Sequence, residues 1–413
     1  MAVQTVANLS SVLKEVWTAT ELAKQFYNQF PLLDRLEKTD RYTIGNQASV
    51  PIQTQRAGAT TTLGAAGGTL NPISRQSVAK GTYTLTYNWA EIGLEFGAIN
   101  QSQGEANSVV EAKILEVQGA IDDMRKDVTR QAFYNGDAII GTVDATAAAT
   151  TINGRTGTTT ISQAITRGYL RPDQKVTIAT SGNPDTVKSS QQIVTVNAAG
   201  NSGAGSFTVG SNVTNANDDL VYIFGARSGT AAGGVNDMLG LRSIYGSTST
   251  TPGGIAASQP WLPAQVDTTT TAMTLDLPLS LQQNVFQQSG SFPTDAVTGI
   301  KQLTNLYKLL QNQVRFSGDI VSAGNVMKLN WNGINLEAYP DCLDNEFYFV
   351  DYSNLLVCTG AYKEPAWASD VEGSNRGSMW SQGTTQFVDG LVYALGLAVR
   401  RRNTGAAAIG LTA

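Results

Sequence analysis

Residues 41 to 100 limit most strongly how this chain can fold. Two runs that alternate apolar and polar residues, 42–52 and 82–89, predict paired strands, and the stretch between them, 56–69, has almost no large side chains. Limbs of about twenty residues would reach roughly 60 Å, whereas a compact domain of this length has a gyration radius of about 20 Å. An isolated two-stranded ribbon is marginally stable in water. The sequence therefore predicts a long hairpin arm that needs the surface of a neighbouring copy.

A long amphipathic helix is predicted directly after the arm, over residues 102–135. Ser102 and Glu105 stand at capping-box spacing, and Asn135-Gly136 supplies an end signal. Such a helix is roughly 45 Å long. A core helix and a short coiled coil are both compatible with its apolar stripe, which comprises Val110, Ile114, Val117, Ile121, Met124 and Val128.

Composition excludes several classes of function. The chain has 413 residues, enough for two or three cores, and its charged fraction of 15% is low, which suits a protein that buries surface against its own copies. A net charge of -5 argues against a chain whose main task is to neutralise nucleic acid. The one basic run, 400–402, is best interpreted as a solvated strand end.

Histidine is absent, which removes Ser/His and Cys/His nucleophile pairs and most zinc or iron sites. Cys342 and Cys358 are the only cysteines and are predicted to be buried thiols in a reducing compartment. The polar start of the chain and the lack of an apolar run of about eighteen residues predict a protein made in a cytoplasm and outside membranes.

The remaining segments predict an α+β chain with an all-β insertion. An N-terminal helix with Trp17 on its apolar face is expected between Ser10 and Phe30, and 137–156 is interpreted as a connector. Helices are expected around 279–286 and 295–311, before a strand-rich region, 327–399. Short β runs within 157–228 indicate a small barrel or sandwich, and they comprise 175–178, 193–196, 206–209 and 220–224.

Candidate chemistry is sparse. The glycine clusters 64–68 and 203–205 lack the residues of a phosphate loop and are better explained as turns. Asp341, Asp344 and Glu346 could hold a divalent cation, but a solvated loop is the preferred interpretation because the spacing matches no calcium loop. Asp122-Asp123 is most simply the solvent face of the long helix. We expect no catalytic residue, no cofactor and no metal.

The order of these parts resembles the major capsid protein of tailed bacteriophages, the Hong Kong 97 type. Four stretches look like parts of that family: Val235-Asn236-Asp237-Met238-Leu239-Gly240-Leu241-Arg242, Pro293-Thr294-Asp295-Ala296-Val297 with the leucines that follow, Gly333-Ile334-Asn335-Leu336 through Tyr352, and Gly168-Tyr169-Leu170-Arg171-Pro172. The resemblance covers nearly the whole chain. It implies an α+β Hong Kong 97-like capsid fold with an inserted all-β subdomain.

The resemblance also implies a division of the chain. The expected units are an N-terminal arm (1–40), an extended loop (41–100), a peripheral domain (101–156) with the spine helix 102–135, the β insertion (157–228), an axial domain with a return to peripheral strands (229–385) and a C-terminal peripheral strand and tail (386–413).

The resemblance predicts a virion shell protein, made in the bacterial host cytoplasm, that forms pentamers and hexamers. Expected partners are a separate scaffolding protein, a portal, decoration proteins and packaged double-stranded DNA bound non-specifically. Some family members join subunits through a loop lysine; Lys80 is the candidate here, although an exposed strand lysine more often blunts an edge. The candidate assembly residues are Lys80, Arg56, Gly58, Gly67, Gly68, Trp89 and Trp17.

Three alternatives remain. An encapsulin-like nanocompartment shell would share the fold and enclose a cargo enzyme. A carbohydrate-binding or adhesive β protein is suggested by 157–228, but the long arm would give it no advantage. A glycosidase would need two carboxyl groups about 5 to 10 Å apart in one cleft.

Overall fold

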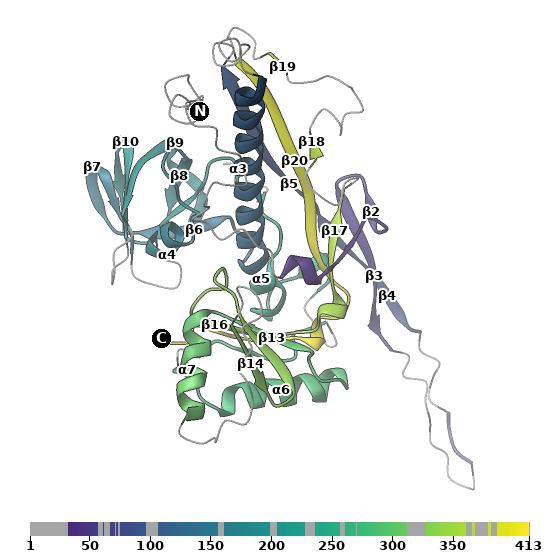
Figure 1. Cartoon of the computed structure of the whole chain (residues 1–413). Coiled ribbons are helices and arrows are strands. Elements are labelled where there is room, and N and C mark those ends of the chain that lie inside the picture. Colours follow the sequence, from purple (N-terminus) through teal and green to yellow (C-terminus); the bar gives the residue numbers. More distant parts are fainter. Residues whose placement is uncertain are drawn as a thin grey trace.

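The computed structural model describes residues 32–56, 61, 67–70, 72, 75–95, 106–155, 161–198, 205–227, 236–256, 261–269, 271–311, 327–360, 366–367, 379–380 and 386–412. These residues form an elongated α+β body from which a hairpin arm and a β-barrel project (Figure 1). The expected helix around Trp17, the tip residue Gly58 and the capping box at 102–105 lie outside the described residues.

The strand β20 (Gln386–Val399) organises the upper part of the body in Figure 1. It pairs antiparallel with β5 (Thr86–Glu95), from Gln386 opposite Glu95 to Leu395 opposite Thr86. The other strands of this sheet are β1 (Glu37–Thr39), β17 (Leu355–Thr359), β18 (Ala366–Trp367) and β19 (Met379–Trp380). Because β1 pairs in parallel with β17, residues 37–39 belong to the sheet and not to the expected N-terminal arm, 1–40.

The predicted long helix is present as α3 (Ala106–Phe133), which lies along β5 and β20 (Figure 1). Met124 and Val128 of the apolar stripe are buried against the sheet. Gly136 follows the helix with a φ of 69°, and a Cβ on it would stand 3.0 Å from the carbonyl oxygen of Met238. Glycine is needed here because other residues rarely adopt this conformation.

The insertion is a closed six-stranded barrel in the order β6-β11-β8-β9-β10-β7. Backbone hydrogen bonds join its first and last strands: Asp144 N–H donates to Asn153 O and Arg155 N–H donates to Thr142 O, both at 2.9 Å. Closure leaves neither edge of the sheet exposed. The elements are β6 (Ile139–Val143), β7 (Thr146–Asn153), α4 (Ile161–Thr166), β8 (Lys175–Thr180), β9 (Asn183–Ala198), β10 (Ser206–Asn215) and β11 (Asp219–Ile223).

The four β runs expected between 175 and 224 are confirmed, but the connector expected over 137–156 is wrong. That segment contains β6 and β7, so the barrel begins before the predicted boundary at 157. Most alanine and threonine residues of β7 are exposed or half-buried, and Ile152 is its buried residue, so no apolar alternation marks this strand in the sequence.

A third six-stranded sheet has the order β12-β21-β16-β13-β15-β14 and forms the lower part of the body in Figure 1. The helices α6 (Asp276–Ser289) and α7 (Ile300–Gln311) pack against it around a second apolar core that includes Leu281, Leu306 and Phe349. Its strands are β12 (Val266–Asp267), β13 (Asp295–Thr298), β14 (Met327–Trp331), β15 (Ile334–Ala338), β16 (Glu346–Val350) and β21 (Ala406–Ile409). The segment 386–413, expected as one C-terminal strand and tail, contributes to two sheets, because β20 pairs with β5 and β21 pairs with β16.

The arm is a three-stranded sheet of β2 (Thr43–Ile44), β3 (Gln47–Gln55) and β4 (Ser77–Thr84). The expected single limb at 82–89 is divided: β4 stays in the arm, and β5 enters the sheet of β20 after Leu85. Short elements complete the body: α5 (Leu241–Tyr245), η1 (Leu33–Arg35), η2 (Pro252–Gly254), η3 (Tyr352–Asn354) and η4 (Arg402–Thr404). Among the described residues, no helix is both long and apolar enough to cross a membrane.

Candidate functional site

The base of the arm is packed against its own subunit. Alternate residues of β3 point inward, so that Ala48, Val50 and Ile52 are buried. On the partner strand, the hydroxyl of buried Tyr83 donates a hydrogen bond to Val399 O of β20 at 3.2 Å. The base is therefore part of the body, and the prediction that the whole arm lacks a core is wrong for this part.

Glycine permits the close approach at the base. A Cβ on Gly253 of η2 would lie 3.0 to 3.1 Å from Tyr83 and Gly81, and its φ is 68°. A side chain there would push η2 away from β4. The tight turn in η2 thus fixes the direction in which the arm leaves the body.

The outer part of the arm is exposed. Val78 is 67% exposed and Leu70 is 68% exposed, although both are large apolar residues. Residues 47–84 contain Arg56, Arg75 and Lys80 and no acidic residue. The outer arm is thus a basic ribbon with apolar side chains in solvent, a surface that a partner would stabilise on contact.

The predicted assembly residues lie in two places. Lys80 is exposed on β4 opposite Pro51, and Arg56 is exposed just beyond β3. Gly67 and Gly68 are exposed in the same arm, and Gly67 has a φ of 83°. Trp89 lies apart from them on β5, and Gly58 and Trp17 are outside the described residues.

Trp89 lies on a sheet face. It is 57% exposed, and a Cβ on Gly390 would come 2.3 Å from its indole ring, so the ring covers that glycine of β20. Tyr87, two residues earlier on the same strand, is 58% exposed. Residues two apart on a strand share a face, so β5 presents two aromatic side chains to solvent.

Buried ion pairs and hydrogen bonds connect the barrel and α3 with the segment between β15 and β16. Asp341, 1% exposed, accepts hydrogen bonds from Lys126 Nζ of α3 at 2.6 Å and from the Tyr169 hydroxyl of the barrel at 2.5 Å. Arg167 donates to Cys342 O at 3.0 Å and pairs with Asp344 at 3.5 Å. We call these residues, 126, 167, 169, 341 and 344, the junction cluster.

Glu346 extends this polar core. It is 0% exposed, pairs with Arg242 of α5 at 3.1 Å and accepts a hydrogen bond from the Tyr348 hydroxyl at 2.7 Å. Burial raises the pKa of Glu346, while Arg242 opposes that rise. Burial also raises the pKa of the Cys342 thiol well above its usual value, which leaves a free and unreactive cysteine.

The preferred interpretation of Asp341, Asp344 and Glu346 as a solvated loop is therefore wrong. Each carboxylate has a cationic partner, so together they tie elements of the fold to one another. No group of residues suited to hold a metal ion occurs among the described residues.

A second buried pair lies where the chain returns from the barrel. Arg130 of α3, 0% exposed, pairs with Asp127 at 2.9 Å and with Asp237 at 2.8 Å. Burial raises the pKa of Asp237 to about 6, although Arg130 lowers it in part. Arg130 was outside the predicted apolar stripe, yet it faces the interior because it has these two partners.

The basic run 400–402 does not behave as one solvated strand end. Arg402 is 0% exposed and donates to Ile244 O at 2.6 Å and to Thr250 O at 2.9 Å, near the end of α5. Burial lowers the pKa of Arg402 to about 10. Arg400 pairs with Glu37 at 3.6 Å, and only Arg401 is largely in solvent.

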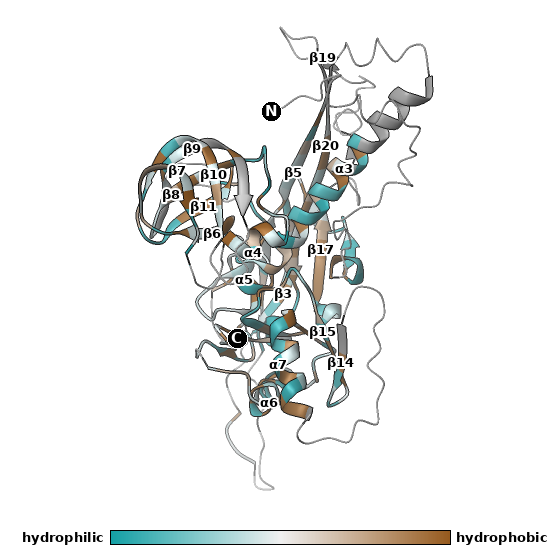
Figure 2. Cartoon of the chain, turned by 60° about the vertical axis from the view of Figure 1, so that its left-hand side comes forward, coloured by the Kyte–Doolittle hydropathy of each residue, from teal (hydrophilic) through white to brown (hydrophobic). Residues whose placement is uncertain are grey.

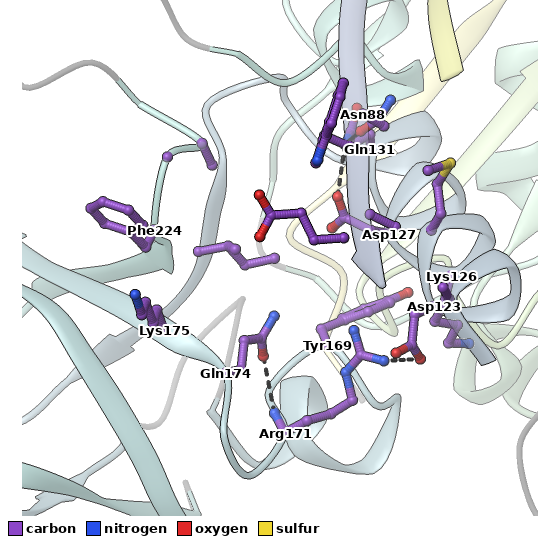
Figure 3. A pocket seen from close by; sticks show the side chains of 18 of the residues that line it. Asn88, Asp123, Lys126, Asp127, Gln131, Tyr169, Arg171, Gln174, Lys175 and Phe224 are labelled. Carbon is purple, nitrogen blue, oxygen red and sulfur yellow. Dashed lines mark hydrogen bonds and ion pairs between the residues drawn. The ribbon is translucent and has the colours of Figure 1, made fainter. Parts of the chain in front are cut away.

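A cleft of about 1140 Å³ separates the barrel from α3 and β5. Figure 3 shows Lys175 and Phe224 on the barrel side and Asp123, Asp127 and Gln131 on the helix side. Two of the charged side chains that line the cleft form ion pairs: Asp123 pairs with Arg171, and Asp127 pairs with Arg130. The first of these pairs joins the two walls, because Asp123 belongs to α3 and Arg171 lies on the barrel side, whereas the second pair lies within α3.

Sequence reasoning identified the arm residues but not the junction cluster. Its members are 126, 167, 169, 341 and 344, and they are distant in sequence and polar. The sequence offered one hint of it: three acidic residues stand close together within 341–346, and no Lys or Arg lies close to them in the chain. Buried carboxylates need such partners, but sequence spacing does not reveal which ones meet.

The described structure was compared with solved structures. A chain of the capsid asymmetric unit of cyanophage A-1(L) matches with a TM-score of 0.56 and 10% identity, over 95% of this chain and 98% of that chain. The chain has a phage capsid fold. The Hong Kong 97-like α+β fold predicted from the sequence is thereby confirmed.

Two other matches have lower scores. The capsid of a native GTA particle matches with a TM-score of 0.46 and 10% identity over 95% of each chain. The SrpI encapsulin complex of Synechococcus elongatus PCC 7942 matches with a TM-score of 0.44 and 10% identity, over 100% of this chain and 96% of that chain. No model of a known protein family and no curated protein sequence matches this chain.

Proposed function

We propose that this chain is a major capsid protein that assembles into the icosahedral shell of a tailed double-stranded DNA bacteriophage. The observation that carries the proposal is the end-to-end structural match to a cyanophage capsid chain, which covers 95% of this chain.

The arm provides independent physical support. Its base is fixed by Val50, Ile52 and Tyr83, while its outer part exposes Val78 and Leu70. A ribbon that is anchored at one end and exposes apolar side chains at the other gains stability when a second molecule covers those side chains. Repeated around a closed ring, such contacts sum over many copies and distribute the stability of a shell.

The proposal assigns no catalytic step to the chain. Two of the carboxylates that line the cleft form ion pairs, Asp123 with Arg171 and Asp127 with Arg130. Copies of the chain in pentamers and hexamers are its main partners, and a scaffolding protein, a portal and decoration proteins are further partners. We place packaged DNA on the inner face of the shell. Because the chain is acidic overall, its contact with DNA is non-specific and modest.

Negative-stain electron microscopy of the expressed protein tests this proposal, with and without a co-expressed scaffolding protein. We expect closed shells of uniform size. A protein that stays monomeric, or forms only small oligomers under every condition, would contradict it. Nucleic acid extracted from particles made during infection supports a virion shell, whereas an enclosed enzyme without DNA indicates a nanocompartment.

A further inference from the structure

Three Asn-Gly pairs occur in the chain, and their surroundings differ. They are Asn135-Gly136, Asn153-Gly154 and Asn332-Gly333. This dipeptide is chemically reactive, because glycine has no side chain to shield the peptide nitrogen that follows the asparagine amide. That nitrogen can attack the side-chain carbonyl carbon and close a five-membered imide. All three asparagines are exposed, so water reaches each of them.

The reaction consumes water and releases ammonia. The glycine nitrogen forms a bond with asparagine Cγ, the Cγ–Nδ2 bond breaks, and the glycine N–H proton leaves with Nδ2 as ammonia. Water then opens the imide at either of its carbonyl carbons, adding OH to the carbon and H to the nitrogen. The products are aspartate and isoaspartate, and in isoaspartate the main chain runs through the side-chain carbon.

Asn153-Gly154 is held in the wall of the barrel. Asn153 is the last residue of β7 and pairs with Ser206 of β10. Gly154 is buried, and its N–H donates to Gly205 O at 2.8 Å. This hydrogen bond must open before the nitrogen can reach the amide carbon.

Asn332-Gly333 forms the turn between β14 and β15 and is held in a similar way. The Gly333 N–H donates to Asn330 Oδ1 at 3.1 Å. The Asn332 amide donates to Gln282 Oε1 at 3.0 Å, so the side chain that would be attacked is fixed as well. Both contacts slow the closure of the imide.

Asn135-Gly136 lacks this protection. The pair follows the last turn of α3, and the Gly136 N–H donates no hydrogen bond to any residue that the structure describes. Asn135 Nδ2 lies 3.5 Å from Asp137 Oδ2, which is at the long limit of a hydrogen bond. The attacking nitrogen and the amide carbon are therefore the least constrained of the three pairs.

Position 135 lies between two residues that are fixed by packing. Tyr134 is buried and meets Tyr169 of the barrel edge-on, with 6.1 Å between ring centroids. Gly136 packs on the segment that returns from the barrel, where a Cβ would stand 3.0 Å from Met238 O. Figure 2 shows this end of α3 beside the barrel. Isoaspartate lengthens the main chain between the two fixed residues, so one of these contacts has to shift.

Both products also add negative charge at this end of α3. The carbonyl end of a helix carries partial negative charge, so a carboxylate is unfavourable there. Burial raises the pKa of nearby Asp237, and the charges of Asp127 and Asp137 add to that rise. A carboxylate at 135 increases the negative charge around this buried group.

We propose that Asn135 is a site of spontaneous deamidation in the folded chain, and that this modification weakens the attachment of the barrel to α3. The reaction requires water alone and takes place in the free subunit. The inference is therefore independent of the proposed function, and neither the formation of shells nor a failure to form them bears on it.

The first test follows all three pairs in one sample. Wild-type protein is kept in mildly alkaline buffer, which favours loss of the glycine N–H proton, and is then digested and analysed by tandem mass spectrometry. Trypsin leaves Asn135 and Asn153 in one peptide, 131–155, so fragment ions assign the modified residue. We expect Asn135 to deamidate about ten-fold faster than Asn153 and Asn332, because their protecting hydrogen bonds must open first.

The same incubation in concentrated urea is the control. In the unfolded chain the three pairs share one dipeptide sequence and have no fold around them, so their rates should be similar. If the native protein shows the same ratio of rates as the unfolded chain, or if Asn135 is not the fastest site, the inference is overturned.

Asn135→Gln tests the effect on the barrel. Glutamine would have to close a larger ring, which is much slower, and the exposed position should accept it without a change in the circular dichroism spectrum of fresh protein. After incubation, wild type should unfold at a lower urea concentration than before, whereas Asn135→Gln should not change. Asn153→Gln is the matched control and should lose stability as wild type does. Equal losses in wild type and Asn135→Gln, or no loss in deamidated wild type, would refute the effect on the barrel.

Discussion

The arm and the barrel both project from the body, but they are attached by different interactions. The arm is held by apolar side chains, with Val50, Ile52 and Tyr83 buried at its base. The barrel is held by buried ion pairs and charged hydrogen bonds, among them the Tyr169 hydroxyl with Asp341 and Arg167 with Asp344. The barrel also closes on itself, whereas the arm remains an open ribbon.

This difference indicates two separate sources of stability. Apolar contacts are non-directional and tolerate small changes in angle, which suits the proposed contact of the arm with differently placed neighbours. Buried charge pairs depend on geometry and lose much stability when one partner is removed. The barrel should therefore keep one orientation on the body, while the arm adapts.

Replacement of Asp341 by alanine is expected to have the largest effect. It leaves the Lys126 ammonium and the Tyr169 hydroxyl without their shared acceptor, and we expect a loss of about 3 kcal/mol in the free energy of unfolding. Urea unfolding followed by circular dichroism measures it. Asp123→Ala is the control, because its pair with Arg171 is largely exposed and should contribute less than about 1 kcal/mol. Equal losses in the two variants would show that the junction cluster does not hold the barrel.

Much of the fold could be predicted from local patterns. The stripe from Val110 to Val128 predicted α3, because the apolar period of an amphipathic helix is set by residues three and four apart and is therefore visible in a short stretch of sequence. The runs at 175–178 and 220–224 predicted barrel strands for the same reason. β6 and β7 were missed because β6 is only five residues long and β7 is rich in alanine and threonine, so that the segment resembles a connector. Their pairing with β11 and β10 reveals them.

The sites were less predictable because they depend on long-range contacts. Arg130 is charged and lies off the apolar stripe, so nothing nearby in sequence indicates its burial beside Asp237, more than a hundred positions away. The exposed apolar residues of α6, Leu279 and Phe286, were also missed. A helix around 279–286 was expected, but exposure of Phe286 follows only from the packing of its other face.

At the arm, Val50→Ala should lower the free energy of unfolding by roughly 1 to 3 kcal/mol, because it removes buried methyl groups beside the body. The same urea experiment measures it. This loss in unfolding free energy should be the same at low and at high salt, because no charge is removed and salt screens only interactions between charges. A loss below about 0.5 kcal/mol would mean that the arm is not anchored at its base.

A pH titration separates the two modes of attachment. The pKa of Asp237 is about 6 in the folded protein against 3.8 for the ordinary side chain, mainly because of burial. The folded state therefore binds more protons than the unfolded state between these values, so this group stabilises the fold as pH falls from 7 to 5 and loses that contribution as pH rises through 6. The free energy of unfolding of the wild type is expected to rise by on the order of 1 kcal/mol as the pH falls from 7 to 5.

Asp237→Asn removes the titrating group. The difference in unfolding free energy between wild type and this variant should change with pH between 7 and 5. The corresponding difference for Val50→Ala should stay constant over the same range. Parallel curves for wild type and Asp237→Asn would show that the charge at the root of the barrel does not contribute to this pH dependence.

The smallest effect is expected in the outer arm of the free subunit. Val78 is 67% exposed, so Val78→Ser should change the free energy of unfolding by less than about 0.5 kcal/mol. In assembled particles the same change should lower the urea concentration at which shells dissociate, because a neighbour covers this side chain there. A large loss in the free subunit would show that the outer arm already packs on its own body, and the distinction between an anchored base and a partner-dependent outer part would then fail.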